Sequence, residues 1–476
     1  MMIDERYKAA RAVLDGVSQQ HALKFYHTLD LEGRQQLLGQ IETIDWRQLR
    51  RLIRTHVREV PKFELPGNVE PAPWYANKPE PADQPKYRQA RQLGEQLVRE
   101  GKVAAFTVAG GQGTRLGWDG PKGSFPATPI RKAPLFQCFA EYILKTQQKY
   151  DTLVPWYVMT SPANDAETWT CFDSHDFFGL DRGQVMLFPQ AMMPAVDMQS
   201  GKVLLAGPDS LALSPNGHGG SLKALYASGA IADMQKRGIE QISYIQVDNP
   251  IVRVIDPQFI GLHAMDGAQM SSKMLPKAYP KERLGNFCII DGKMTVIEYS
   301  DLPDELAEQR LPDGQLRFLA GSIAIHALRV DFVEWLNTRP DGFALPFHRA
   351  EKKVPYIDTD TGERHDPDRP NAVKLEMFVF DALPFCDKSI IYETDRADEF
   401  GPIKDTDSLD SPATSRATQI ERAGHWLELH GVKVPRNKRG RVDAVIEISQ
   451  LTAIESKDLD GVELPNEIER GSEVVL

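Results

Sequence analysis

Cysteine is scarce in this chain of 476 residues, which has four cysteines and no C-x-x-C pair. Cys138, Cys171, Cys288 and Cys386 are scattered along the sequence. A disulfide-stabilised scaffold or a zinc site needs a denser or more closely spaced set. We therefore expect reduced, mostly buried thiols, as in a cytoplasmic protein.

Long apolar runs and a leader-like start are also missing. No apolar run reaches the ~18 residues of a membrane-spanning helix. The first residues, MMIDERYKAARAVL, are charged early and lack the basic and then apolar profile of a signal peptide. We therefore expect a cytoplasmic location and no membrane partner.

The chain has no excess of positive charge, with 56 Lys and Arg against 67 Asp and Glu and a formal net charge of −11. Nucleic acids and anionic membranes require a basic face, so neither is an expected partner. Hydrophobic residues make up 41% and charged residues 26%, which is typical of a folded protein with a sizeable core. A small anionic ligand in a local basic pocket stays compatible with this balance.

Local patterns divide the chain into three predicted domains. Residues 1–96 begin with helical spacing and continue into a proline-rich connector between Pro61 and Pro85. Residues 97–410 alternate strand-like and helical segments, and residues 411–476 form a small C-terminal domain. The alternation predicts an α/β fold, a Rossmann-like, mixed but mostly parallel sheet with helices on both faces.

Individual segments of the central domain have clear patterns. Strand character marks residues 102–110, 156–161, 184–190 and 242–249. Helical patterns mark residues 87–101, 164–178, 219–238 and 374–383. Residues 285–302 predict a hairpin with Asp291-Gly292 as its two-residue turn, which makes the sheet mixed.

A glycine-rich loop with two basic side chains follows the first of these predicted strands. Residues 109–117 read AGGQGTRLG, and Pro121-Lys122-Gly123 comes shortly after. Three glycines in four positions allow close backbone approach and positive φ, so successive N–H groups can converge on a phosphate. Because Arg115 and Lys122 add positive charge, a phosphate site is favoured over a tight turn without a ligand.

The glycine spacing excludes two familiar nucleotide motifs. The P-loop pattern G-x-x-x-x-G-K-[ST] is absent. The spacing from Gly111 through Gly113 to Gly117 is one residue too long for the dinucleotide fingerprint, and no acidic strand end follows about 20 residues later. A dinucleotide-dependent oxidoreductase is therefore the weaker interpretation.

The pattern A-G-G-x-G-T-R-L-G followed by P-K-G resembles the nucleotide loop of the eukaryotic-type UTP:sugar-1-phosphate uridylyltransferases, most of all the UDP-N-acetylglucosamine pyrophosphorylase branch. Further segments resemble this family in the same order, from about residue 35 to residue 461. They are residues 188–197, 214–220, 244–261, 273–285, 296–302, 348–358, 371–385 and 446–461.

The resemblance implies a nucleotidyltransferase domain of the glycosyltransferase-A-like kind. It implies transfer of a uridylyl group from UTP to a sugar 1-phosphate, giving a UDP-sugar and pyrophosphate. UDP-N-acetylglucosamine is the expected product. UDP-glucose, UDP-galactose or broad specificity is the alternative, and a non-catalytic nucleotide-sugar-binding module is an alternative of another class. The partners would be these small molecules, and the oligomeric state is left open.

UTP contacts carried over from the family extend beyond the glycine loop. Gln190 matches a uracil contact, since its side chain offers the donor and acceptor that an imide edge needs. Gly217 resembles a glycine on which the base lies. Either Lys352 or Lys353 reaches the phosphates, with Lys353 as the candidate. The implied UTP-binding residues are Val108, Ala109, Gly110, Gly111, Gln112, Gly113, Thr114, Lys122, Gln190, Gly217 and Lys353.

The same resemblance implies contacts with the sugar phosphate and a catalytic set. Glu298 and Tyr299 match a pair that holds sugar hydroxyls, and Lys374, at the start of a predicted helical stretch, matches a phosphate-binding lysine. With His218 they form the implied sugar-phosphate site. The implied catalytic residues are Arg115, Lys122 and Lys374.

His218 departs from the branch that the rest of the chain resembles. The N-acetylglucosamine branch usually has Asn at this position, whereas the glucose and broad-specificity branches usually have His. Either His218 replaces Asn as a hydrogen-bond donor to a sugar hydroxyl or phosphate, or the preferred sugar differs. Both interpretations stay open.

Asp248 is the candidate metal ligand. It ends a predicted strand at the carboxyl edge of the sheet, where open α/β sheets bind their ligands. Its carboxylate could hold Mg²⁺, or Mn²⁺, shared with the α-phosphate of UTP, or it could simply cap the next turn. The two D-x-D tripeptides at residues 358–360 and 366–368 lie among turn-forming residues and predict turns instead of a metal site.

Overall fold

The computed structural model describes residues 2–60 and 67–476, so the start of the predicted proline-rich connector, residues 61–66, lies outside the described residues. The chain forms two compact units. Unit 1 comprises Met1–Leu65, Gln190–Ala224 and Leu345–Asp381, and unit 2 comprises Pro66–Pro189, Leu225–Ala344 and Ala382–Leu476. The domain boundaries predicted after residues 96 and 410 stay predictions.

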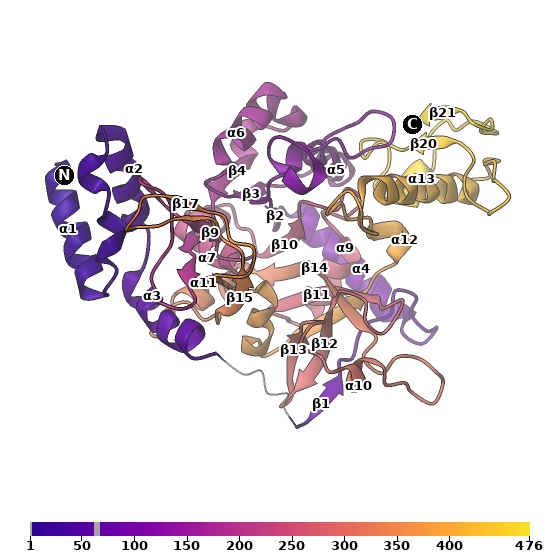
Figure 1. The fold of residues 1–476 in the computed structure, drawn as a ribbon. Helices are drawn as coiled ribbons and strands as arrows, with labels where there is room; N and C mark the ends of the chain where they lie inside the picture. Colours follow the sequence, from indigo (N-terminus) through magenta and orange to yellow (C-terminus); the bar gives the residue numbers. More distant parts are fainter. Residues whose placement is uncertain (1, 61–66) are drawn as a thin grey trace. The chain divides into compact units, whose positions relative to one another are not determined.

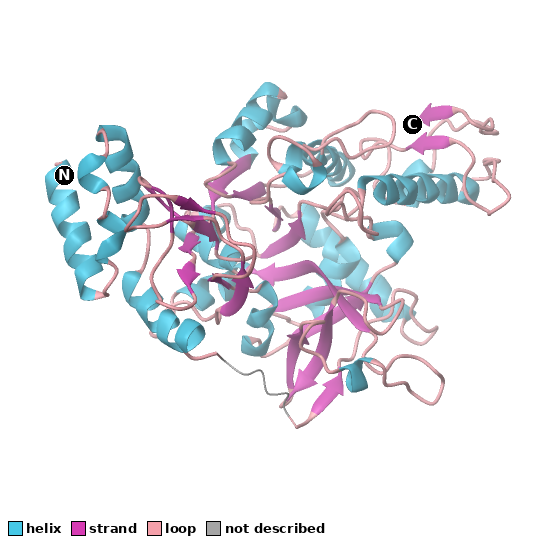
Figure 2. Ribbon diagram, viewed as in Figure 1, coloured by secondary structure: helices cyan, strands magenta, loops and turns pink. Residues whose placement is uncertain are grey.

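Unit 2 is built on a ten-stranded sheet, whose main path has the order β1-β12-β14-β10-β2-β3-β4 (Figures 1 and 2). Strands β10, β2, β3 and β4 run parallel to one another, and β14 is antiparallel to β10. The path strands are β1 Val69–Pro71, β12 Gly285–Ile290, β14 Ala320–Arg329, β10 Gln241–Gln246, β2 Val103–Val108, β3 Trp156–Thr160 and β4 Val185–Pro189. The predicted mixed, Rossmann-like sheet is confirmed.

Three further strands extend this sheet. Strand β11 (Met270–Pro276) pairs antiparallel with β14 and parallel with β19 (Ser389–Glu393). Strand β13 (Lys293–Ile297) forms the predicted hairpin with β12. The turn residues Asp291 and Gly292 have φ angles of 49° and 75°, as a two-residue type I′ turn requires.

Helices cover both faces of the sheet, as alternate residues of β3 show. Trp156 contacts Phe136 and Phe139 of α5 on one face. On the other face, the Tyr157 hydroxyl donates to the Asp233 carboxylate of α8 at 2.7 Å. The helices with residues in unit 2 are α4 Gln84–Arg99, α5 Leu135–Tyr150, α6 Asp165–Ser174, α7 Gly220–Ala227 (which begins in unit 1), α8 Ala230–Lys236, α9 Pro257–Met265, α10 Asp304–Ala307, α11 Val330–Asn337, α12 Arg396–Glu399 and α13 Pro412–Leu429.

The C-terminal segment of unit 2 has a small core of its own around α13, which includes Trp426, Leu427 and Ile446. Its strands β20 (Val445–Glu447) and β21 (Glu473–Val475) pair in parallel. An ion-pair network ties this segment to α5, because Arg131 bonds Glu141 at 2.7 Å and Glu447 at 2.6 Å. Arg131 therefore has a structural role.

Unit 1 combines the N-terminal helices with short strands from two later segments. The helices are α1 Ile3–Gly16, α2 Leu31–Glu42 and α3 Trp46–Leu52, followed by the π-helical turn η3 Ile53–Arg58. The strands are β5 Met192–Pro194, β6 Val196–Asp197, β7 Leu205–Gly207, β8 Ser210–Leu211, β9 Leu213–Pro215, β15 His348–Lys352, β16 Tyr356–Ile357, β17 Arg364–His365 and β18 Ala372–Glu376. Helices and strands share one apolar core that includes Leu14, Leu37, Leu49, Val196 and Val373.

Two further predictions concern the cysteines and the turns. All four cysteines are free thiols, and three of them are buried, as expected. In the loop between β16 and β17, Asp358 Oδ1 accepts N–H bonds from Asp360 and Thr361, which is the predicted turn chemistry. No helix within the described residues is both long and apolar enough to cross a bilayer.

Candidate active site

The glycine loop leaves β2 as predicted, and protein donors hold its carbonyl groups. The Asn164 side-chain amide donates to the carbonyl oxygens of Ala109 and Gly111 at 3.0 and 3.1 Å. The backbone N–H of Lys122 also donates to Gly111 O, and that of Gly113 to Gly120 O. The loop is therefore fixed through its acceptors.

The backbone N–H groups at the start of this loop have no such partners. Among the described residues, the amides of Gly110, Gly111 and Gln112 donate no hydrogen bond to a backbone carbonyl. Three consecutive N–H groups without protein acceptors, on exposed or half-exposed residues, can bind an anion. The expectation of positive φ was wrong for the glycines at 110, 111 and 113, because the left-handed conformations occur at Gly117 and Gly120 instead.

Lys122 stands behind this loop and is mostly buried, with 15% of its side chain exposed. Its Nζ lies 3.9 Å from Asp248 Oδ2. Burial lowers the pKa of Lys122, and the cations Lys404 and Arg115 lower it further against the opposing effect of Asp248. The fold therefore holds a desolvated ammonium group among other cations, an arrangement that a bound phosphate would stabilise. Arg115 itself is exposed.

Asp248 lies two residues beyond the end of β10, at the carboxyl edge of the sheet as predicted. Its carbonyl oxygen accepts the backbone N–H of Ile403 at 2.8 Å, which brings Lys404 to the same place. Burial disfavours the charged form of Lys404, but the carboxylates of Asp248 and Asp410 outweigh it and raise its pKa. Sequence reasoning missed Lys404, because it is an isolated lysine in a loop without a spacing pattern.

Asp248 fits a magnesium ion that arrives with a nucleotide. Within residues 2–60 and 67–476, no group of three or more His, Cys, Asp or Glu side chains is arranged to hold a metal. Mg²⁺ is commonly bound through one or two carboxylates plus substrate phosphates, so a single hard oxygen ligand at 20% exposure suffices for this mode.

Glu298 and Tyr299 follow directly after β13 in unit 2. Glu298 is half-buried, and Tyr299 is 48% exposed. Lys122 and Asp248 belong to the same unit.

Unit 1 brings together a second group of predicted residues. Strands β5 and β9 pair so that the N–H of Asn216 donates to the carbonyl of Ala191, which places Gln190 beside the turn at Gly217. The Gln190 side chain is 6% exposed, and its Oε1 has no hydrogen-bond partner within the described part of the chain. A buried acceptor without a protein donor can accept from a ligand or from water.

Gly217 occupies a position that only glycine fits. Its φ is +84°, and a Cβ atom there would lie 2.3 Å from the carbonyl oxygen of Met377. The same turn is bonded to the segment after β18, since Met377 N–H donates to Asn216 O and Gly219 N–H donates to Met377 O. Residues 216–219 are therefore locked against residue 377, three residues after Lys374.

Lys374 lies in strand β18, so the prediction of a helical stretch at this residue was wrong. Val373 and Leu375 alternate into the core of unit 1 with the period of a strand, which leaves Lys374 on the other face and half-buried. A 3₁₀ helix, η8, begins only at Val379. Lys352 ends β15 and Lys353 follows it, and both side chains are exposed.

His218 packs against aromatic rings in unit 1. Its ring lies 5.4 Å from the ring of Phe378, and its Nδ1 accepts the backbone N–H of Val379 at 3.1 Å. Burial lowers the pKa of His218 to about 4, with a smaller effect from His348. The imidazole is therefore neutral near pH 7, and because Nδ1 is an acceptor, the proton is on Nε2.

This depressed pKa predicts a pH-dependent contribution to stability. Between pH 6.5 and 4 the unfolded chain protonates His218 and the folded chain does not, so stability falls as the pH falls through this window. Between pH 7 and 5, wild type should lose on the order of 1–2 kcal/mol more unfolding free energy than His218→Asn. Denaturant titration at both pH values measures the difference, and equal losses would contradict the assignment.

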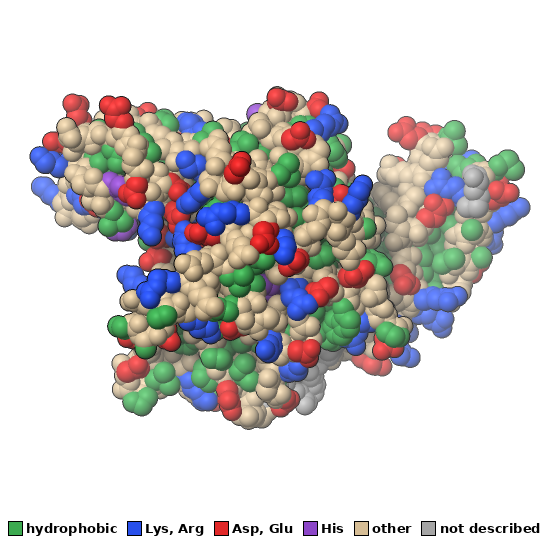
Figure 3. Space-filling view, turned by 180° about the vertical axis from the view of Figure 1, so that it is seen from behind, with side chains coloured by type: hydrophobic (Ala, Val, Ile, Leu, Met, Phe, Trp, Pro, Cys, Tyr) green, Lys and Arg blue, Asp and Glu red, His purple; other side chains and the backbone are tan. Residues whose placement is uncertain are grey.

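Over the face shown in Figure 3, Lys and Arg side chains are interspersed with Asp and Glu. In this mixed, mostly parallel sheet, strand β2 leads into a glycine-rich loop with a buried lysine beside it. This arrangement defines a class of enzyme that binds nucleotide phosphates.

Comparison with known proteins identifies the family. The model of the UTP–glucose-1-phosphate uridylyltransferase family matches residues 73–416. A mouse (Mus musculus) protein named UDP-N-acetylhexosamine pyrophosphorylase-like protein 1 is 35% identical over 485 residues, covering 94% of this chain and 93% of its own. The UDP-N-acetylglucosamine pyrophosphorylase of Saccharomyces cerevisiae is 32% identical over 429 residues, covering 86% and 88%.

A solved structure extends this likeness to the fold. The uridine diphosphate N-acetylglucosamine pyrophosphorylase from Trypanosoma brucei, in complex with an inhibitor, superposes with a TM-score of 0.84 at 25% identity, covering all of this chain and 98% of the other. The chain belongs to the UTP–glucose-1-phosphate uridylyltransferase family, whose members are nucleotidyltransferases. The resemblance seen in the sequence is thereby confirmed.

Proposed function

We propose that this chain transfers the uridylyl group of UTP to N-acetylglucosamine 1-phosphate, giving UDP-N-acetylglucosamine and pyrophosphate. The observation that carries the proposal is the glycine loop, with three consecutive amides without partners and the desolvated Lys122 behind them. The choice of N-acetylglucosamine is supported by the names of the yeast and trypanosome relatives, and the name of the mouse relative supports an N-acetylhexosamine.

The proposed chemistry needs no protein nucleophile. An anionic oxygen of the sugar 1-phosphate attacks the α-phosphorus in line, and pyrophosphate leaves from the opposite side. The loop amides, Arg115 and Lys122 bind the triphosphate, and Lys374 binds the sugar phosphate. Catalysis then consists of positioning two anions that repel each other and stabilising the charge on the phosphoryl oxygens. Glu298 and Tyr299 are proposed to hold the sugar hydroxyls, and Lys353 to reach the nucleotide.

Magnesium, or manganese in its place, is proposed to bind Asp248 together with the nucleotide. When bound, it would neutralise phosphate charge and favour in-line geometry. Lys404 shares the surroundings of Asp248, and we propose that it adds a further cation for the phosphates. The cytoplasmic location is also part of the proposal, supported by the four free thiols.

His218 supports the N-acetylglucosamine assignment in one respect. Its Nδ1 accepts the backbone N–H of Val379, so the ring proton is on Nε2, and an N–H group is the kind of donor that a sugar hydroxyl or phosphate requires. An Asn side chain offers an N–H donor as well. We therefore propose that His218 replaces the Asn of that branch in the same role, while UDP-glucose, UDP-galactose or broad specificity stays the alternative.

A substrate panel tests the reaction and the sugar together. The protein is incubated with UTP, Mg²⁺ and the 1-phosphates of N-acetylglucosamine, N-acetylgalactosamine, glucose and galactose, and pyrophosphate release is measured. We expect the highest kcat/KM with N-acetylglucosamine 1-phosphate. A preference for glucose or galactose would support the alternative sugar. UTP or UDP-sugar binding without pyrophosphate release from any donor would identify a binding module.

Gln190→Leu should raise the KM for UTP about 5- to 30-fold, because a desolvated amide contact to the base contributes about 1–2 kcal/mol. Its stability should not fall, since Oε1 has no protein partner to lose. Gln184→Leu is the matched control, because the Gln184 amide donates to Gln147 and Val154 inside the fold. That control should lose stability and keep its KM. An unchanged KM in Gln190→Leu would contradict the uracil contact.

A further inference from the structure

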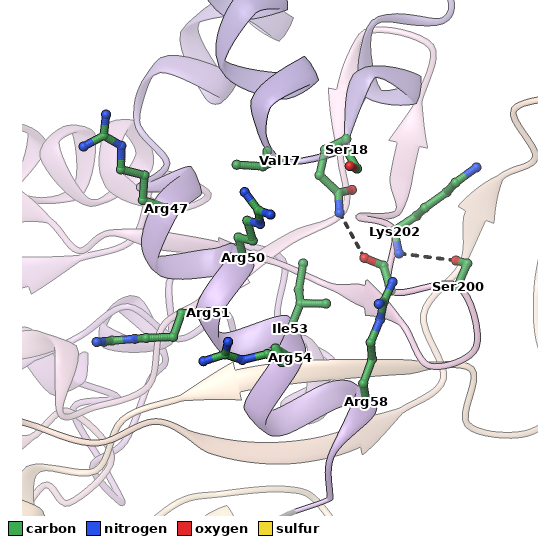
Figure 4. Close-up of a pocket in the computed structure, with 12 residues that line it drawn as sticks. Val17, Ser18, Arg47, Arg50, Arg51, Ile53, Arg54, Arg58, Ser200 and Lys202 are labelled. Atoms are coloured by element: carbon green, nitrogen blue, oxygen red, sulfur yellow. Dashed lines mark hydrogen bonds between the residues drawn. The ribbon is translucent and has the colours of Figure 1, made fainter.

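A second basic site lies within unit 1, and none of its lining residues is assigned to UTP or the sugar phosphate. A pocket of about 640 Å³ opens beside α3 and the π-helical turn η3 (Figure 4). Its charged lining side chains are all basic and are Arg47, Arg50, Arg51, Arg54, Arg58 and Lys202. The figure shows the arginines projecting from the helical stretch, with Ser200 and Lys202 coming from the loop on the other side.

The spacing of the arginines concentrates like charges on one helical face. Residues 47, 50, 51, 54 and 58 recur at intervals of one, three and four, while Leu49, Leu52, Ile53 and Val57 of the same stretch are buried in the core. Like charges three or four residues apart destabilise a helix. Polar residues of any kind would keep this face of the helix in contact with water. The fold therefore does not require five arginines there.

These arginines also lack the carboxylate partners that others in unit 1 have. Arg6 is paired with Glu42 at 2.8 Å, and Arg349 with Glu351 at 3.0 Å. Among the described residues, none of the six basic side chains of the pocket lies in an ion pair. Arg50 donates to the carbonyl oxygen of Gly16 at 3.1 Å, which fixes its side chain without neutralising its charge.

Guanidinium groups match phosphate oxygens through paired N–H donors and stay charged at every physiological pH. The pocket volume lies within the range of small-molecule sites, about 300–1,000 Å³. A long polyanion such as nucleic acid would extend beyond the pocket and be repelled by the rest of the chain, whose net charge is −11. We propose that this pocket binds a compact small molecule that carries three or more clustered phosphate groups.

The test uses inorganic tripolyphosphate as the probe and the full-length chain in isothermal titration calorimetry. The variant Arg47→Gln/Arg51→Gln/Arg54→Gln removes three pocket charges. The variant Lys8→Gln/Arg11→Gln/Lys24→Gln removes three exposed charges from the same unit outside the pocket. We expect affinity on the order of 1,000-fold weaker in the pocket variant, since it loses three charge-assisted contacts that each contribute about tenfold. The control should stay within threefold of wild type.

Turnover separates this proposal from the proposed function. Both triple variants should release pyrophosphate at the wild-type rate without added tripolyphosphate, because neither changes a residue assigned to the substrates. Failure of turnover in wild type would concern the proposed function alone. Equal tripolyphosphate affinity in wild type and the pocket variant would overturn the pocket proposal, whatever the turnover.

Three further probes identify the source of the phosphates, namely myo-inositol hexakisphosphate, ATP and a single-stranded RNA of 20 nucleotides. Tightest binding of tripolyphosphate, the inositol phosphate or ATP, lost in the pocket variant, supports the proposal and names the source. The proposal would be overturned in favour of a nucleic-acid surface if the RNA bound more tightly than tripolyphosphate, the inositol phosphate and ATP, and if the pocket variant lost this RNA binding.

Discussion

Lys122→Ala should reduce kcat/KM for pyrophosphate release on the order of 10²–10³-fold, the usual cost of removing one preorganised charge contact. Lys122 is mostly buried beside Asp248, with Lys404 and Arg115 close enough to lower its pKa. Its charge is therefore already desolvated before substrate binds, so no solvent reorganisation is needed at the reacting phosphate. Both the KM for UTP and kcat should change.

The stability of the Lys122 variant separates a catalytic from a structural role. The fold disfavours the charged form of Lys122, so Lys122→Ala should unfold at a temperature no lower than wild type. Lys132→Ala is the matched control, because Lys132 lies in the same segment and, among the described residues, its Nζ donates to the Pro129 carbonyl alone. Near wild-type kinetics in Lys122→Ala, or a lowered melting temperature that accounts for its loss of activity, would refute the assigned role.

Lys374→Ala should cause a loss of similar size, on the order of 10²–10³-fold in kcat/KM, but through the other substrate. Lys374 lies in β18, two residues before Glu376 and three before the bonds that lock the Gly217 turn. We expect a raised KM for the sugar 1-phosphate and a lower kcat, with the KM for UTP little changed.

A bisubstrate kinetic analysis distinguishes this pattern from that of Lys122→Ala. Lys24→Ala serves as the control, since Lys24 is an exposed lysine of unit 1. Equal effects on the KM of both substrates, or a circular dichroism spectrum unlike that of wild type, would show that Lys374 supports the structure and not the sugar phosphate.

Six strands of the large sheet, β2, β3, β4, β10, β12 and β13, could be predicted because their segments carry a local pattern, whereas the longer strands β11 and β14 were missed. The predicted segments 102–110 and 156–161 match the bounds of β2 and β3 to within two residues, since an apolar run between turn signals indicates a buried parallel strand. Asp291-Gly292 predicted the hairpin because a type I′ turn needs positive φ at both positions. Gln190 and Asp248 could be placed at or just beyond strand ends because the apolar runs before them are recognisable as strands.

Other features carried no usable local signal. The segment VKLEMFVF is apolar enough to satisfy both helical and strand periods, and only packing in unit 1 shows that Val373 and Leu375 alternate as a strand. The strands of residues 190–224 are two or three residues long, too short for periodicity. Lys404 joins Lys122 through a backbone bond from Ile403 to Asp248, a contact across more than 150 positions that local sequence does not encode.

The central claim is tested most directly by phosphorus NMR of one reaction mixture. The protein, UTP, Mg²⁺ and N-acetylglucosamine 1-phosphate carrying ¹⁸O in its phosphate are followed until substrate is consumed. We predict UDP-N-acetylglucosamine and pyrophosphate in equal amounts, with all ¹⁸O in the β-phosphate of the UDP-sugar and its bridge, and unlabelled pyrophosphate. Labelled pyrophosphate, or resonances of the two substrates alone, would contradict uridylyl transfer by in-line attack of the sugar phosphate.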